Sequence, residues 1–355
     1  MRAAVLRQRQ MVVDDWPDLT PGPGQVLIET VACGICGSDL HTVDHAHEMA
    51  DTAKEVGMGV FAFDPDRDMV MGHEISARVL ELGAGLDDGP AVGTAMAVMP
   101  TLTTPTRRAT PGYDNEYPGG YCERMLVDPS ALVPVPNGLD PVIAALTEPM
   151  AVGLHAVNES SAAKGRGAVV LGAGPVGQSV IAALAVLGAE PIVVSEYSPR
   201  RRELARRLGA HVVVDPASPG DAANGFAAAV QGWRDNRTGA KEPPVIFEAV
   251  GVPGLIDGAM TAAPNRSELV VVGVCMQPDN FRPIMGIYKH LTVRFVLGWN
   301  GAEFRQSLRN LAEGLIPGDA LITGQVTLEE TPAAFAALAN PEEHVKIMVR
   351  PNGLG

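Results

Sequence analysis

The sequence predicts an α/β protein of two domains, one rich in β-strands and one built on a doubly wound parallel sheet. The chain has 355 residues, which exceeds the roughly 250–300 residues at which a single hydrophobic core usually splits. Short strand-like runs separated by turns fill its first third. Beyond about residue 150, buried apolar runs alternate with helical patterns, which is typical of a parallel sheet covered by helices on both faces.

The first third indicates strands over residues 3–6, 25–29, 75–82 and 119–127, the second of them introduced by a Pro-Gly-Pro-Gly turn. We expect the metal-type residues here on loops held by these strands. Residues 100–120 are rich in Thr, Pro and Gly and indicate an exposed irregular lobe.

The second part carries six segments that are short enough for strands. Five of them are short apolar runs, over residues 167–171, 191–195, 211–214, 244–247 and 269–272, and residues 291–297, which include Arg294, would be a sixth strand. The tail indicates a helix over 331–338 and a strand over 345–349, which we expect to return to the first domain. The predicted domains are therefore residues 1–150 with 298–355, and residues 151–297.

Composition excludes several classes of protein. There are 27 Lys and Arg against 41 Asp and Glu, a net charge of −14, which argues against nucleic acid or an anionic membrane as partner. Four cysteines in this length do not form a disulfide framework. The N-terminus has no sustained apolar core, and we find no run typical of a membrane helix. We expect a cytoplasmic protein.

A glycine-rich turn indicates a dinucleotide site. Gly172, Gly174 and Gly177 directly follow a predicted buried strand and open a predicted helix, the context that this motif requires. Glycines permit the tight turn, the approach of a pyrophosphate and close packing of helix on strand, while the helix N-terminus favours the anion. Pro175 and Val176 start that helix, and we expect them to contact the cofactor as well.

The preference for NAD is predicted from Glu196, at the end of the next strand, because a carboxylate there accepts ribose hydroxyls and repels a 2′-phosphate. Three arginines at 200–202 could instead receive a phosphate. We interpret them as the exposed first turn of a helix capped by Ser198. Arg201, Val250 and Val274 complete the predicted cofactor contacts.

Two short segments indicate a metal site. Cys33 and Cys36 form a C-x-x-C, and His73 and Glu74 follow Gly72. A thiolate and an imidazole suit zinc, whereas C-x-x-C alone could be a redox pair. The downstream Gly-His-Glu favours zinc ligation by Cys36 and leaves Cys33 as a packed small residue.

Together with residues 148–155 and the glycine turn, these segments resemble the zinc-dependent medium-chain alcohol and polyol dehydrogenases over essentially the whole chain. The resemblance implies a GroES-like catalytic domain interrupted by a Rossmann domain. It implies Cys36 and His73 as zinc ligands and Glu148 as the third, with Glu74 as an exchanging or neighbouring catalytic carboxylate. Which glutamate is the third ligand stays open. Asp39 would hold the ring of His73.

The same resemblance implies the chemistry. Zinc and NAD would be the cofactors, and a small alcohol or polyol would ionise on zinc and release hydride to NAD. Ser38 would pass the alcohol proton through the cofactor ribose to His41. Pairing of subunits through the sixth strand, as a homodimer or homotetramer, would fit the family.

The sequence departs from many relatives in three places. Cys122 is the one cysteine near residues 100–120, so we expect one catalytic zinc per subunit and no structural zinc. The stretch from His41 to Val70 is longer than usual; it either shapes the substrate site or is a solvated insertion. Gly37 replaces a basic residue that some relatives place against the pyrophosphate.

Two other classes of protein share parts of this pattern. One is a zinc-free quinone or enoyl reductase of the same superfamily, which would not need Cys36, His73 and Glu148. The other is a non-catalytic binding protein on this fold, against which the intact ligand and relay residues argue.

Overall fold

The computed structural model describes residues 1–355 except 62, 219–224, 238–241, 339, 341 and 355. Its contacts divide the chain into two compact units. Unit 1 comprises Met1–Glu148, Leu311–Glu313 and Ile322–Gly355, and unit 2 comprises Pro149–Asn310 and Gly314–Leu321. The domain boundaries given above stay a prediction.

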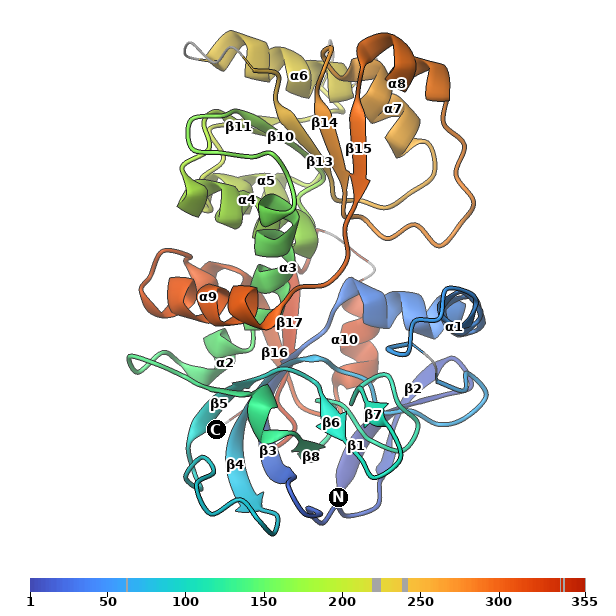
Figure 1. Ribbon diagram of the computed structural model, residues 1–355, viewed down its shortest axis with the longest axis vertical. Coiled ribbons are helices and arrows are strands. Elements are labelled where there is room, and N and C mark those ends of the chain that lie inside the picture. The colour runs from blue at the N-terminus through green and yellow to red at the C-terminus, as the bar shows by residue number, and fades with distance from the viewer. Residues whose placement is uncertain (62, 219–224, 238–241, 339, 341, 355) are drawn as a thin grey trace. The chain divides into compact units, whose positions relative to one another are not determined.

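Unit 1 is built on a seven-stranded sheet in the order β16-β17-β3-β4-β5-β9, with β8 also pairing with β3 (Figure 1). The strands are β3 Val26–Gly34, β4 Glu74–Leu82, β5 Ala95–Val98, β8 Arg124–Val127, β9 Leu132–Pro134, β16 Ile322–Val326 and β17 Lys346–Val349. A hairpin of β1 (Arg2–Arg7) and β2 (Gln10–Asp15) stands beside it. The tail thus joins this sheet, because β17 pairs with β3.

The register between β3 and β4 brings the predicted metal-binding residues together. The two strands are antiparallel, and Gly34 at the end of β3 faces Glu74 at the start of β4. Both strands are largely buried, with apolar residues at most positions, so the pairing is held firmly in the core. Residues just after β3 and just before β4 are therefore neighbours.

A helix follows β3 where the sequence predicts a loop. Helix α1 (Gly37–Glu55) begins after Cys36, whose backbone N–H donates to Asp39 Oδ2 at 2.9 Å. This bond satisfies one of the free groups at a helix start. Glu148 also lies in a helix, α3 (Thr147–Asn158). The expectation that the metal-type residues of the first third lie on loops is confirmed for Cys36 and His73, which stand just before α1 and β4, and is wrong for Glu74, which opens a strand.

The lobe between β5 and β8 is fastened by polar side chains. It contains the short strands β6 (Leu102–Thr103) and β7 (Arg108–Ala109). Asp128 accepts the backbone N–H and the hydroxyl of Thr103 at 2.7 and 2.9 Å. Arg107 forms an ion pair with Asp114. Leu102 and Ala109 are buried in a small apolar cluster beneath.

Unit 2 contains a six-stranded parallel sheet in the order β12-β11-β10-β13-β14-β15. The strands are β10 Ala168–Leu171, β11 Ile192–Ser195, β12 Val212–Val214, β13 Val245–Glu248, β14 Glu268–Val271 and β15 Thr292–Phe295. All six predicted strands are confirmed. The strand order reverses between β10 and β13, which is where ligands bind in such sheets.

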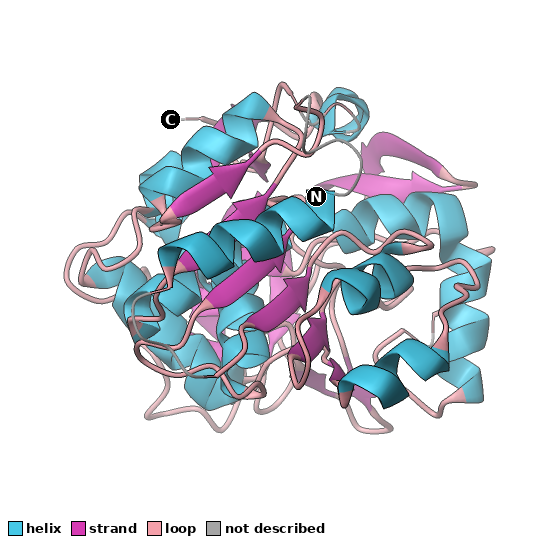
Figure 2. Ribbon diagram, turned by 90° about the horizontal axis from the view of Figure 1, so that it is seen from above, coloured by secondary structure: helices cyan, strands magenta, loops and turns pink. Residues whose placement is uncertain are grey.

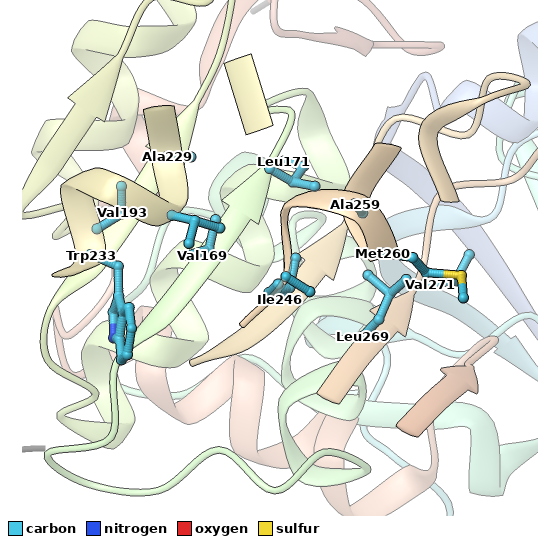
Figure 3. Close-up of a cluster of buried hydrophobic side chains, with 12 residues drawn as sticks. Val169, Leu171, Val193, Ala229, Trp233, Ile246, Ala259, Met260, Leu269 and Val271 are labelled. Atoms are coloured by element: carbon cyan, nitrogen blue, oxygen red, sulfur yellow. The ribbon is translucent and has the colours of Figure 1, made fainter. Parts of the chain in front are cut away.

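Helices cover both faces of this sheet. They are α4 Pro175–Leu187, α5 Pro199–Arg207, α6 Gly225–Asn236, α7 Leu255–Ala262 and α8 Pro283–Lys289, and α9 (Gly301–Ala312) follows β15. Helix α4 contacts α5, and α6 contacts α7; Figure 2 shows helices running along the strands. Trp233 of α6 and Met260 of α7 pack on β-strand residues such as Val169 and Ile246 (Figure 3).

The remaining described elements are short: helix α2 (Pro141–Ala144), helix α10 (Thr331–Leu338) and two 3₁₀ turns, Pro129–Ala131 and Gly318–Ala320. None of the helices in the described residues has the length and apolar character needed to cross a membrane.

Candidate metal centre and cofactor-binding turn

Three residues in unit 1 present metal-binding atoms to one another. The Cys36 thiol, the His73 imidazole and a Glu74 carboxylate oxygen all lie within 4.8 Å of each other, and within the described residues they form the one such group. Thiolate, imidazole and carboxylate are the ligands that zinc takes in proteins. The donor set therefore fits a zinc ion.

Asp39 orients two of these groups from beneath. Its side chain is fully buried. Oδ1 lies 3.5 Å from His73 Nδ1, and Oδ2 accepts the N–H of Cys36 and, at 2.6 Å, the hydroxyl of Tyr121. A carboxylate behind the ring fixes which imidazole nitrogen faces the metal, so Nε2 of His73 is the nitrogen available for zinc.

Glu74 has a strong partner that the sequence did not reveal. Lys346 Nζ donates to both carboxylate oxygens at 2.6 and 2.7 Å, and to the carbonyl of Ile35 at 3.0 Å. Burial would lower the pKa of Lys346, but attraction to Glu74 and Cys36 outweighs it and raises that pKa. The one feature of the sequence that could have indicated this partner is the single lysine in the otherwise apolar strand β17.

Gly34 makes room for this ion pair. A Cβ built on Gly34 would lie 1.9 Å from Glu74 Oε2. No side chain can therefore occupy position 34 while the Glu74 carboxylate stays where Lys346 holds it.

Glu148 is buried in the first turn of α3. It is not among the three clustered residues. It does lie close enough to Lys346 to contribute to the raised pKa of that lysine. Lys346 thus attracts both candidate carboxylates electrostatically, and the choice of third ligand stays a prediction.

The two relay residues follow the metal ligand on α1. Ser38 Oγ lies 3.5 Å from His73 Nε2 and accepts the hydroxyl of Tyr113 at 2.9 Å. His41 lies one turn further along, so both project from one helix face. Burial and, secondly, the nearby His45 lower the pKa of His41. The neutral, proton-accepting form of His41 is thereby favoured.

The other cysteines differ in exposure. Cys33 is fully buried, and burial raises its pKa well above the ordinary range, so it remains a neutral thiol. Burial raises the pKa of Cys122 to about 12. Cys275 is only half-buried because it lies beyond the end of β14.

In unit 2 the glycine turn has the expected local structure. Gly172 has φ +87°. A Cβ on Gly177 would lie 2.1 Å from the Gly172 carbonyl oxygen. The turn can therefore pack against the helix only if residues 172 and 177 have no side chain. Helix α4 begins at Pro175, followed by Val176. By contrast, a Cβ on Gly174 would meet only the end of the Arg201 side chain, at 3.7 Å. This leaves the space that a phosphate group needs.

Glu196 forms hydrogen bonds with the glycine-rich turn. Its carboxylate accepts the N–H of Ala173 at 2.6 Å and that of Ser198 at 2.8 Å. Ser198 caps α5 as predicted, and Arg202 is bound to carbonyls and to Asp215. Glu196 therefore ties the glycine turn to the start of α5.

Val250 and Val274 follow the ends of β13 and β14. Both side chains are nearly half exposed. The loops that carry them approach closely, because a Cβ on Gly251 would lie 2.4 Å from the Val274 carbonyl oxygen. Their place at the carboxyl ends of the strands next to the reversal point is where a dinucleotide binds in this type of sheet.

Comparison with known proteins agrees with this geometry. Residues 22–137 match the alcohol dehydrogenase GroES-like domain, and residues 175–313 match the zinc-binding dehydrogenase domain. The chain is 32% identical to the (R,R)-butanediol dehydrogenase of Bacillus subtilis over 93% of each protein. It is 27% identical to the sorbitol dehydrogenase of the same species, over 99% of this chain and 98% of that protein.

The crystal structure of 2R,3R-butanediol dehydrogenase from Bacillus subtilis superposes with a TM-score of 0.82, at 30% identity and over 99% of both chains. A protein with this pair of folds and this donor set is a zinc-dependent oxidoreductase. The chain belongs to the zinc-dependent medium-chain alcohol and polyol dehydrogenase family, whose members use zinc and a nicotinamide dinucleotide.

Proposed function

We propose that this chain is an NAD-dependent dehydrogenase of small vicinal diols and polyols, with one catalytic zinc held by Cys36, His73 and Glu148. The observation that carries the proposal is the convergence of Cys36, His73 and a carboxylate in unit 1. In a chain of this family, such a donor set binds the catalytic zinc. Glu74, held by Lys346, is the carboxylate proposed to stand beside the metal or to exchange with Glu148.

Zinc supplies a Lewis acid that lowers the pKa of an oxygen it polarises, to about 7 for water, and NAD accepts the hydride. The chain itself supplies orientation and a proton route. Asp39 sets the His73 ring, and Ser38, 3.5 Å from His73 Nε2, is placed to take the proton of a substrate hydroxyl. His41, whose pKa is lowered by burial and by His45, is the proposed acceptor at the end of the route.

The substrate class is proposed from the relatives. Butanediol and sorbitol, named for two of them, both offer a secondary hydroxyl next to a second carbon that bears oxygen. A diol of this kind places one oxygen for reaction and one for recognition. We therefore propose vicinal diols, and the hydroxyketones formed from them, as substrates.

The preference for NAD over NADP is proposed from Glu196. Its carboxylate lies between Ala173 and Ser198, at the end of the second strand of the sheet, where ribose hydroxyls bind in this fold. The contacts with Gly172, Gly174, Pro175, Val176, Gly177, Arg201, Val250 and Val274 belong to the same proposal.

We also propose a homodimer formed through β15. In the described sheet this strand pairs on one side only, with β14. Phe295 and Leu297 are 65% and 59% exposed, and an unpaired edge with apolar side chains favours pairing with another copy. A reducing cytoplasm, which suits the unpaired cysteines, is the proposed location.

The first test is elemental analysis of protein purified without added metal, together with NAD reduction on a panel of butanediol isomers, sorbitol and simple alcohols. We expect about one zinc per chain, turnover that chelators abolish, and a preference for vicinal diols. Quinone reduction by NADPH in zinc-free protein would favour the zinc-free reductase. Bound zinc and NAD without turnover on any alcohol would favour a binding protein.

A further inference from the structure

Three segments that are far apart in the sequence meet at one tyrosine. Tyr113 lies in the lobe between β5 and β8 and is 6% exposed. Its hydroxyl donates to Ser38 Oγ on α1 at 2.9 Å. Its ring packs edge-on against Phe61, with ring centroids 4.6 Å apart, and lies 5.2 Å from the ring of His73.

The bond to Ser38 limits where that hydroxyl can point. A serine hydroxyl has one proton and two lone pairs. Tyr113 donates to one lone pair, so the Ser38 proton and the second lone pair must take the remaining directions around the oxygen. An oxygen that receives one proton and releases another needs both of these directions to be fixed.

We propose that Tyr113 is a positioning residue of the dehydrogenase reaction, which orients the Ser38 hydroxyl for proton transfer and is held in place by Phe61. The proposal rests on the proton route suggested above. In each transfer Ser38 gains the proton of the substrate hydroxyl and gives its own proton onward. Tyr113 keeps its proton throughout.

The long stretch after His41 thereby gains a role. Asn115, two residues after Tyr113, accepts the N–H of Asp64 at 2.8 Å. Its amide donates to the carbonyls of Asp64, Arg67 and Asp68 at 3.1–3.3 Å. Phe61 adds the ring contact from the same stretch. These contacts brace the segment that carries Tyr113 against the insertion.

The test compares Tyr113→Phe with Tyr117→Phe in the zinc-loaded enzyme. Tyr117 lies in the same lobe, and its ring contacts Arg107, which phenylalanine preserves. We expect Y113F to lower kcat about tenfold, roughly the factor of one lost hydrogen bond, and to change KM less than about twofold. The solvent deuterium isotope effect on kcat should increase. Zinc content and unfolding temperature should match those of Y117F.

A double-mutant cycle with Ser38→Ala separates the two proposals. If Tyr113 acts through Ser38, Y113F has no further effect in the S38A background. An equal further loss in that background overturns the role of Tyr113, as does a wild-type kcat and isotope effect in Y113F. Full turnover in S38A overturns the proton route itself.

A second variant covers the case in which Y113F loses zinc or stability. Phe61→Leu keeps the tyrosine hydroxyl but removes the ring that packs on it. We expect a smaller fall in kcat with the same rise in the isotope effect. A wild-type isotope effect in F61L would contradict the role given to Phe61.

Discussion

Lys346 and Glu74 form a buried ion pair beneath the metal centre, with Nζ at 2.6 and 2.7 Å from the two carboxylate oxygens. Their side chains are 3% and 0% exposed. Such a pair contributes little net stability relative to apolar residues, but removing one partner leaves an uncompensated buried charge. The pair therefore holds the Glu74 carboxylate in a fixed position.

Lys346→Met should lower the free energy of unfolding of unit 1 by about 3–5 kcal/mol, because Glu74 is left buried without its counter-charge. Urea denaturation followed by circular dichroism measures this. Lys54→Met, on the exposed end of α1, is the control and should change stability by less than about 0.5 kcal/mol. Adding Glu74→Met to K346M should restore most of the loss. Wild-type stability in K346M would contradict the importance of the pair.

Glu148→Ala and Glu74→Ala should differ in zinc affinity. Loss of the third ligand should weaken zinc binding by more than about 100-fold, whereas loss of a carboxylate beside the metal typically weakens it 10- to 100-fold. Competition with a chromogenic chelator measures both. Glu81→Ala, on the exposed part of β4, is the control. The reverse order of effects would assign Glu74 as the ligand.

The acid limb of alcohol oxidation should follow the pKa of His41. Burial first, and His45 second, lower that pKa, so the proton-accepting form persists to lower pH than for a solvated histidine. The corresponding contribution to stability is present above the unfolded-state pKa and is lost as the pH falls through the folded-state pKa. His45→Gln removes the neighbouring charge, 6.4 Å away between ring centroids, and should move the limb to higher pH.

The control for this pH profile is His47→Gln. His47 is exposed and pairs with Asp66 at 3.1 Å, away from the influences on His41. Profiles of kcat/KM against pH for wild type and both variants provide the comparison. An unchanged limb in H45Q, or an equal shift in H47Q, would show that another group sets it.

Glu196→Ala should raise the ratio of kcat/KM for NADP to that for NAD by at least about tenfold, about 1.4 kcal/mol. The reason is that a carboxylate facing a 2′-phosphate is repulsive. Initial rates with both cofactors measure the ratio. Glu203→Ala, exposed on α5, is the control. Arg201→Ala in the E196A background should remove the gain; a gain that survives would exclude Arg201 as the phosphate partner.

Phe295→Asp should convert the proposed dimer to a monomer, because a charge on an edge strand opposes pairing. Light scattering coupled to size-exclusion chromatography measures the mass in solution. Val92→Asp introduces the same charge at another exposed apolar position, 65% exposed in unit 1, and should leave the mass unchanged. A monomeric wild type would reject pairing through β15.

Most strands of the parallel sheet could be predicted because they are short apolar runs bounded by turn residues, as in Val169 and Val170 of β10. Strand β15 is less regular, because it contains Arg294. Cys36, His73 and Glu74 could be named from local motifs. Helix α1 was missed because its start depends on the Asp39 side chain capping Cys36, while its later part is polar and kinked at His45.

Lys346 and Tyr113 could not be recognised from the sequence. Lys346 acts on Glu74 across 272 residues of chain, and Tyr113 acts on Ser38 across 75. Neither pair has a fixed spacing that a motif could express. Their roles depend on the pairing of β17 with β3 and on the packing of the lobe, which only the folded chain defines.

The lobe that is held by Asp128 and by the Arg107–Asp114 pair affects how much zinc a cell must supply for each chain. A lobe held by four thiolates would bind a second zinc ion in every chain. It would unfold when oxidants attacked the thiolates or when zinc was scarce. We expect no structural zinc here, because hydrogen bonds and ion pairs among the chain's own side chains hold the lobe. We expect zinc starvation to inactivate this enzyme without unfolding the lobe, so that activity returns when zinc is supplied again.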